Sequence, residues 1–286
     1  MKSILLIFCS VFILLSCKKE GNISDGELSP AIQQNFTDVS YGNDAKQKMD
    51  IYLPKGRSVS TTKTLVLLHG GGWTEGDKTD MTVVVDSLKA RFPDFAFINI
   101  NYRLAVNGTA NVFPTQENDV KSAIGFYLDK SSEYNVSKQL IVSGASAGGH
   151  LALLYSYKDD VDKNVKAVID FFGPTDLVSL WNAGLTQQLI LITATGQLYD
   201  QDHDLYVQAS PINFIDTHSP PTIALQGGAD PLVPASQSTL LIAKLQASSV
   251  ANQLVFYEGG GHGNWPAATY SDAFNKIYNF IIANVH

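Results

Sequence analysis

The chain has 286 residues and a net charge of −7, and 45% of its residues are hydrophobic. This length can bury one large core and is short for two enzyme domains, so we expect one catalytic domain behind a short leader. The few Lys and Arg residues form no long basic run, which argues against a nucleic-acid partner. The sequence has no zinc-type group of Cys and His and no Walker glycine loop, so no metal or nucleotide cofactor is expected.

The N-terminal segment has the pattern of an export signal followed by a tether. Residues 1–16 contain an apolar run, Ile4 to Leu15, that is too short to span a bilayer. The run ends in Leu-Leu-Ser-Cys at Cys17, which resembles the bacterial lipobox, although an ordinary signal peptide ending near a cysteine would look similar. We expect an exported lipoprotein on the periplasmic or cell-surface side, anchored only by acyl chains on Cys17. Residues 17–35 are polar and lack apolar periodicity, which is typical of a tether.

The catalytic domain is expected to extend over residues 36–286, where short β-rich runs alternate with helical windows. This alternation indicates an α/β fold with a mostly parallel central sheet and helices on both faces. The segment 48–53 alternates and stops at Pro54, so it is expected to be a half-exposed strand. Compact apolar runs predict buried parallel strands at 64–68, 95–101, 139–143, 165–171 and 222–226. Helices are expected at 77–92, 116–130, 147–157, 235–247 and 267–284.

A G-x-S-x-G motif occupies residues 144–148, directly after an expected strand and before a helical window. In this context the glycines permit a strained turn that exposes a serine hydroxyl at the N-terminus of a helix. The motif therefore predicts Ser146 as a nucleophile. A Gly- and Ser-rich tight turn without a catalytic role is the alternative interpretation.

The segment His69-Gly70-Gly71-Gly72-Trp73 follows the strand expected at 64–68. It occupies the loop that supplies the second part of an oxyanion hole when such a sheet carries a nucleophilic serine. Three successive glycines let backbone N–H groups approach a developing oxyanion, which a Cβ atom would obstruct. We expect the amides of Gly71, Gly72 and Ala147 to form this hole and His69 to be structural. A flexible glycine turn is the alternative.

His262 is the best placed of six histidines to act as general base. It stands in a glycine-rich segment immediately after the apolar run 254–257, where a strand end would deliver its imidazole above the sheet. Asp230 follows the strand before that and is the favoured acid, although it could instead be a turn or N-cap residue. Asp170 and Asp176 are its rivals. The chain order Ser, Asp, His supports the assignment.

These motifs resemble the α/β-hydrolase superfamily of serine esterases and lipases. The similarity is greatest to the small bacterial esterases that include feruloyl and acetyl esterases of carbohydrate, and it covers nearly all of 36–286. It rests on His69 to Trp73 with Gly76-Asp77-Lys78, Asn101 to Leu104, Phe113-Pro114 with Asp119, Gly144 to His150, Asp230 and His262. Arg103 and Asp119 have no evident catalytic task and are expected to be a structural pair. An apolar N-terminal cap segment is missing, so only the stretch 174–220 can shape a lid.

The resemblance implies two-step acyl transfer through an acyl-enzyme, without a cofactor. The implied substrate is a small-molecule or oligosaccharide ester, such as an acetyl or feruloyl group on carbohydrate. Trp73 and Trp265 are expected to offer flat faces to it, unless either ring belongs to the core. Hydrolysis of an amide by the same residues stays open, as does a catalytically silent binding protein, and the oligomeric state is unknown.

Overall fold

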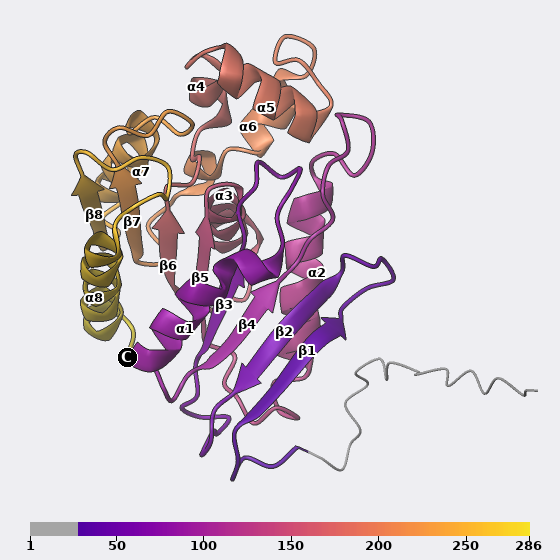
Figure 1. Cartoon of the computed structure of the whole chain (residues 1–286), viewed down its shortest axis with the longest axis vertical. Helices are drawn as coiled ribbons and strands as arrows, with labels where there is room; N and C mark the ends of the chain where they lie inside the picture. Colours follow the sequence, from indigo (N-terminus) through magenta and orange to yellow (C-terminus); the bar gives the residue numbers. More distant parts are fainter. Residues whose placement is uncertain (1–27) are drawn as a thin grey trace, which may run out of the picture.

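The computed structural model describes residues 28–286, so the expected signal peptide and Cys17 lie outside the described residues. Its centre is an eight-stranded sheet in the order β1-β2-β4-β3-β5-β6-β7-β8 (Figure 1). The strands are β1 (Gln34–Ser40), β2 (Lys48–Leu53), β3 (Thr64–Leu68), β4 (Ala96–Ile100), β5 (Leu140–Ala145), β6 (Val165–Phe171), β7 (Thr222–Gly227) and β8 (Asn252–Tyr257). Strand β2 is antiparallel to both of its neighbours, and the strands from β4 to β8 are parallel. This confirms the expected mostly parallel α/β fold.

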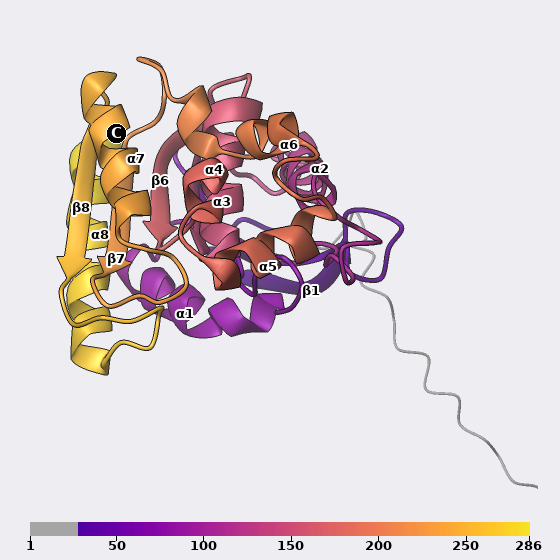
Figure 2. The same cartoon turned by 90° about the horizontal axis from the view of Figure 1, so that it is seen from above.

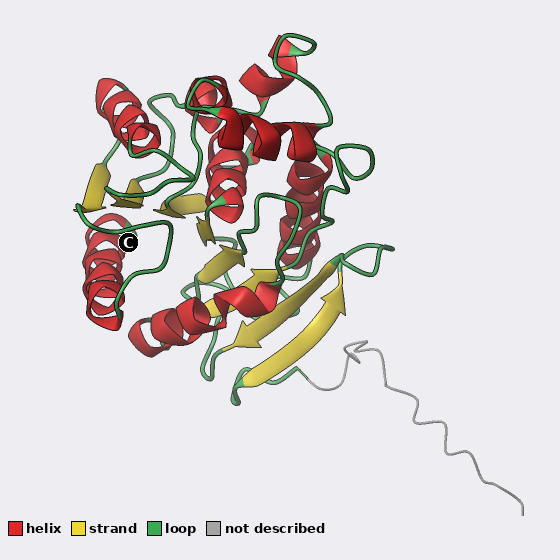
Figure 3. Cartoon of the chain, turned by 45° about the horizontal axis from the view of Figure 1, so that its top comes forward, coloured by secondary structure: helices red, strands yellow, loops and turns green. Residues whose placement is uncertain are grey.

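Helices cover both faces of the sheet, as Figures 2 and 3 show. All five residues of strand β3 are buried, which accounts for the apolar run in its sequence. Val66 and Leu68 face one apolar cluster, whereas Leu65 and Leu67 face the other. The first cluster includes side chains of α2 (Thr115–Asp129), α3 (Ala147–Leu154) and α7 (Ser236–Ala247), and the second includes those of α1 (Thr82–Arg91) and α8 (Ala267–Asn284).

Four details differ from the sequence-based expectation. Strand β2, which was expected to be half-exposed, is buried at four of its six positions. The window 77–92 divides into a 3₁₀ turn, η1 (Lys78–Met81), and α1, and Asp77 caps the turn by accepting a hydrogen bond from the Thr79 amide. The helix after the G-x-S-x-G motif ends in a π turn, η2 (Tyr155–Asp159). Strand β1 was not expected and begins within the predicted tether, because its mostly exposed edge position needs no apolar alternation.

The insertion between β6 and β7 forms a helical layer over the carboxyl ends of the central strands (Figure 1). We call residues 174–220 the cap. It contains α4 (Leu177–Trp181), α5 (Leu185–Thr195), α6 (His203–Gln208) and the 3₁₀ turn η3 (Pro211–Phe214). Within residues 28–286, no helix has the length and apolar character needed to cross a membrane.

Candidate active site

Ser146 occupies a strained turn between β5 and α3. Its backbone has φ 54° and ψ −121°, a conformation that few non-glycine residues adopt. The turn depends on its glycines, because a Cβ on Gly144 would lie 2.1 Å from the Gly148 carbonyl oxygen and one on Gly148 would lie 2.2 Å from the Leu68 oxygen. The Ser146 amide donates to the Phe171 carbonyl at 2.8 Å, which ties the turn to the neighbouring strand. The hydroxyl is thereby held above the sheet at the start of a helix.

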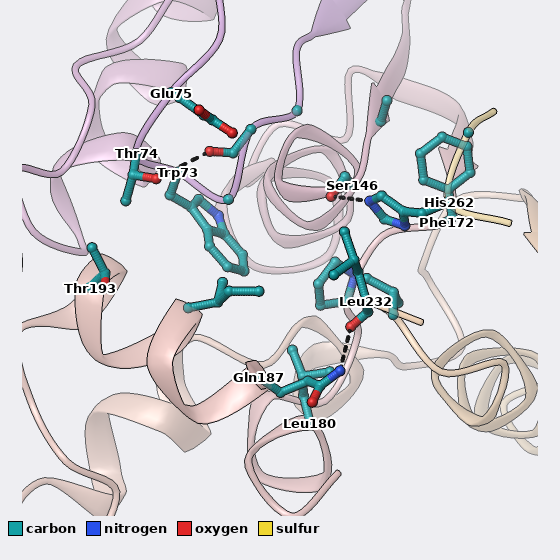
Figure 4. Close-up of a pocket in the computed structure, with 18 of the residues that line it drawn as sticks. Trp73, Thr74, Glu75, Ser146, Phe172, Leu180, Gln187, Thr193, Leu232 and His262 are labelled. Carbon is teal, nitrogen blue, oxygen red and sulfur yellow. Dashed lines mark hydrogen bonds between the residues drawn. The ribbon is translucent and has the colours of Figure 1, made fainter. Parts of the chain in front are cut away.

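His262 bridges Ser146 and Asp230. Its Nε2 lies 2.8 Å from Ser146 Oγ (Figure 4), and its Nδ1 lies 2.7 Å from Asp230 Oδ2. A carboxylate can only accept hydrogen bonds, so Nδ1 carries the proton and Nε2 accepts from the serine hydroxyl. The other carboxylate oxygen, Oδ1, accepts from the amides of Leu232 and Val233 at 2.9 Å each, in a fully buried site. The three predicted residues are therefore brought together in one hydrogen-bonded chain.

The two rival aspartates have other partners. Asp176 caps α4 by accepting a hydrogen bond from the Ser179 amide at 3.0 Å. Asp170 is fully buried below the turn and accepts from the Gly173 amide at 2.9 Å, and burial raises the pKa of its carboxyl to about 8. Among the described residues, neither carboxylate is hydrogen-bonded to His262.

The glycine loop after β3 leaves free amides beside Ser146. Gly71 and Gly72 have φ values of 103° and 57°, and a Cβ on Gly71 would lie 2.2 Å from the Glu75 carbonyl oxygen. Within residues 28–286, the amides of Gly71, Gly72 and Ala147 donate no hydrogen bond. Ala147 is the first residue of α3, whose leading N–H groups have no partner within the helix. The three expected oxyanion donors are thus available to a ligand.

The other two histidines near this loop have structural contacts. His69 is buried, lies 2.7 Å through Nδ1 from the Gly70 carbonyl oxygen and stacks on Tyr102 at 4.3 Å, as its expected structural role requires. His150 accepts a hydrogen bond from Trp73 Nε1 at 3.2 Å and donates one from Nε2 to the Ala209 carbonyl at 2.6 Å. Burial lowers the pKa of His150 to about 4, so the ring is neutral at pH 7. It joins the glycine loop, α3 and the end of the cap.

A cavity of about 410 Å³ opens above Ser146 (Figure 4). The cap and the loop after β7 give it an apolar wall of Leu180, Ile190, Leu232 and Val233. Its polar lining includes Thr74, Glu75, Gln187 and Thr193. The stretch 174–220, which was expected to shape a lid, supplies Leu180, Gln187, Ile190 and Thr193 to this lining, although no motif marked which of its side chains would face the cavity.

The two tryptophans have different positions. Trp73 lines the cavity, as expected, although the residue as a whole is only 3% exposed. Trp265 does not line the cavity, and its buried ring belongs to the core, which is the alternative that the sequence left open. Its ring packs against Phe172 with centroids 5.4 Å apart, and its Nε1 donates to the Gly261 carbonyl at 2.8 Å. Phe172 is the aromatic residue beside the histidine, with its ring centroid 4.7 Å from that of His262, and its place directly after β6 could have indicated it.

Arg103 and Asp119 form the expected structural pair away from the cavity. Arg103 Nη2 lies 2.7 Å from Asp119 Oδ1, and the Arg103 amide donates to Oδ2 at 2.8 Å. The carboxylate is buried, so the bidentate contact satisfies a charge that would otherwise be costly.

A mostly parallel sheet whose carboxyl edge carries this serine turn and histidine chain defines the α/β-hydrolase superfamily. The BD-FAE family model matches residues 49–245, and the chain belongs to this family. The chain is 29% identical over 235 residues to "Probable carboxylic ester hydrolase LipM" of Mycobacterium tuberculosis, covering 77% of this chain and 53% of that protein. It is also 25% identical over 197 residues to "Kynurenine formamidase" of Danio rerio, covering 67% of this chain and 60% of the relative. The chain thus spans between one half and two thirds of the length of these relatives.

Solved structures share the fold. A bifunctional GH43-CE protein of Bacteroides eggerthii superposes with a TM-score of 0.77 at 27% identity, covering 91% of this chain and 39% of that chain. A truncated carbohydrate esterase from gut microbiota superposes with a TM-score of 0.75 at 24% identity, covering 89% of this chain and 97% of that chain. The second similarity supports the fold alone.

Proposed function

We propose that this chain is a serine carboxylic-ester hydrolase. The observation that carries the proposal is the position of His262, within 2.8 Å of Ser146 Oγ and 2.7 Å of Asp230 Oδ2. A serine hydroxyl that donates to a histidine oriented by a buried carboxylate is activated for acyl transfer. Membership of the BD-FAE family and the name of the mycobacterial relative support ester hydrolysis.

In the proposed mechanism, Ser146 Oγ attacks the ester carbonyl and its proton passes to His262 Nε2. Asp230 stabilises the resulting imidazolium and keeps the ring in the required orientation. The carbonyl oxygen becomes negative and accepts hydrogen bonds from the free amides of Gly71, Gly72 and Ala147. The alcohol leaves with the proton from His262, and a water molecule activated by the same nitrogen then releases the acid from the acyl-serine.

We propose that the acyl group is short or aromatic, such as acetyl or feruloyl, and that the alcohol belongs to a carbohydrate. The sequence resemblance to feruloyl and acetyl esterases provides most of the support. The cavity of about 410 Å³ lies near the small end of ligand pockets, and α4 and α5 close its apolar wall. Such a cavity suits a compact acyl group better than a long chain, while a bulky alcohol can extend into solvent.

Amide hydrolysis is a second candidate. The similarity to the kynurenine formamidase supports it, because the same hydrogen-bonded chain can attack either kind of carbonyl. An exported location would favour the ester, since polysaccharide fragments are met outside the cell. We propose that location on the lipobox-like sequence that ends at Cys17.

The deciding experiment compares kcat/KM on acetylated xylan fragments and methyl ferulate with that on long-chain acyl esters and N-formylkynurenine. We expect a preference for the first two. A tenfold preference for either of the others, about 1.4 kcal/mol of transition-state stabilisation, would refute the substrate assignment and leave the mechanism intact. Ser146→Ala should lower kcat on the best substrate about a millionfold with an unchanged melting temperature.

A further inference from the structure

The cavity contains a carboxylate outside the histidine chain. Glu75 lies four residues after Gly71 and lines the cavity together with Thr74 (Figure 4). Its amide donates to the Gly71 carbonyl at 3.0 Å, which fixes the residue on the glycine loop. Its side chain also lies over this glycine, because a Cβ on Gly71 would be only 3.2 Å from Glu75 Cγ. The Glu75 side chain therefore starts beside Gly71, one of the proposed oxyanion residues.

Among residues 28–286, no cationic side chain pairs with this carboxylate. In the part of the chain that the structure describes, the Glu75 side chain forms no ion pair and no hydrogen bond, and no Lys or Arg lines the cavity. A negatively charged ligand group would thus meet repulsion without a compensating cation, whereas an O–H donor would find a strong acceptor.

Glu75 is exposed, so its carboxylate lies where the cavity meets solvent. An alcohol that belongs to a carbohydrate chain has to leave the cavity on the solvent side. Thr193, on α5 of the cap, adds a hydroxyl to the lining, and this hydroxyl donates to the Leu189 carbonyl at 2.7 Å and keeps its acceptor capacity. The apolar wall of Leu180 and Ile190 is left for the acyl group.

We propose that Glu75 selects the alcohol of the substrate by charge. It accepts hydrogen bonds from the hydroxyl groups of an uncharged sugar and rejects an alcohol that carries a carboxylate, such as a uronic acid. This inference rests on the proposed esterase function and adds a specificity-determining residue to it.

The test uses acetate esters of matched shape and different charge. Acetylcholine, its uncharged carbon isostere dimethylbutyl acetate and a carboxylate-bearing analogue of the same skeleton are compared by kcat/KM at low ionic strength. For the wild type we expect the cationic ester to be favoured over the anionic one by about tenfold or more, and less at high salt. Glu75→Gln should reduce this ratio to about one, and Glu75→Lys should invert it.

Glu258→Gln is the matched control, because Glu258 is an exposed glutamate four residues before His262 that does not line the cavity. It should keep the wild-type ratio. A second pair, a sugar acetate and its cyclohexylmethyl analogue, tests the hydroxyl contacts, and Glu75→Gln should lower the preference for the sugar severalfold.

Equal rates on the cationic and anionic esters in the wild type, or a ratio that survives Glu75→Gln, would overturn the inference and leave the esterase function standing. Failure of the wild type to hydrolyse any of these esters or the xylan and ferulate substrates would instead refute the esterase function, and the inference with it.

Discussion

The role of Asp230 can be tested by one substitution whose effect follows from its hydrogen bonds. In Asp230→Asn, the side-chain amide has to place one oxygen and one NH₂ group where two carboxylate oxygens were. The site of Oδ1 receives two N–H donors, from Leu232 and Val233, so the asparagine oxygen belongs there. The NH₂ group then faces His262 Nδ1, which has to lose its proton and become an acceptor. Nε2 becomes protonated and can no longer take the Ser146 proton.

The opposite amide orientation would leave both backbone donors unpaired in a buried site, at a cost of about 2 to 6 kcal/mol. We therefore expect kcat to fall about ten thousandfold, as for a triad locked in the wrong tautomer. Ester hydrolysis at pH 7 measures the loss, and the melting temperature should show that the fold persists. Asp176→Asn is the control, because asparagine is as good an N-cap as aspartate, and it should change kcat less than about twofold. The reasoning fails if Asp230→Asn retains kcat within tenfold of the wild type, or if Asp170→Asn or Asp176→Asn is the crippling change.

Two further predictions concern the membrane anchor and the buried histidine. Expressed with its leader in a bacterial host that lipidates proteins, the chain should partition into detergent, and Cys17→Ala should abolish this; a soluble, unlipidated product of the intact sequence would contradict the anchor. His150 is neutral in the fold because burial lowers its pKa to about 4, so unfolding takes up a proton between about pH 4 and 6.5. The contribution of His150 to the free energy of unfolding is therefore constant above pH 6.5, and it falls by roughly 3 kcal/mol as the pH is lowered toward 4. Urea titrations should show the difference in unfolding free energy between the wild type and His150→Gln changing by this amount over the same pH range. The comparison cancels the opposite pH trend that Asp170 contributes to both proteins. A difference that does not depend on pH would refute the prediction.

The strands and the reacting groups could be predicted because both have local causes. A buried parallel strand needs an apolar run, and β3 and β6 have the bounds that their runs predict. The turn at Ser146 needs glycines at fixed offsets, so its motif is visible in the sequence. The carboxyl ends of parallel strands meet at one edge, which is why residues as distant as Ser146 and His262 could be expected to lie together.

The lining of the cavity could not be predicted in the same way. The positions of α4 and α5 depend on contacts with loops far away in the sequence, and no short motif records such contacts. Trp265 shows the same limit. Its position three residues after His262 suggested that it would line the cavity, but its ring packs in the core against Phe172. The direction of a side chain follows from its position in the sequence only where the backbone forms a regular helix or strand.

The cap is hydrogen-bonded at two points to the segments that support the reacting groups, so it is part of the site as well as its cover. Gln187 on α5 donates through Nε2 to the carbonyls of Pro231 and Leu232, at 3.1 Å each, in the same loop whose amides hold Asp230. At its other end, the cap receives a hydrogen bond at the Ala209 carbonyl from His150, the residue that also fixes Trp73 beside the glycine loop. A changed cap sequence would therefore alter the cavity wall together with the supports of the acid and of the oxyanion loop. Substrate range and catalytic geometry are coupled in this fold, because the cap that closes the cavity also shares hydrogen bonds with the loop that holds Asp230 and with the histidine that contacts Trp73.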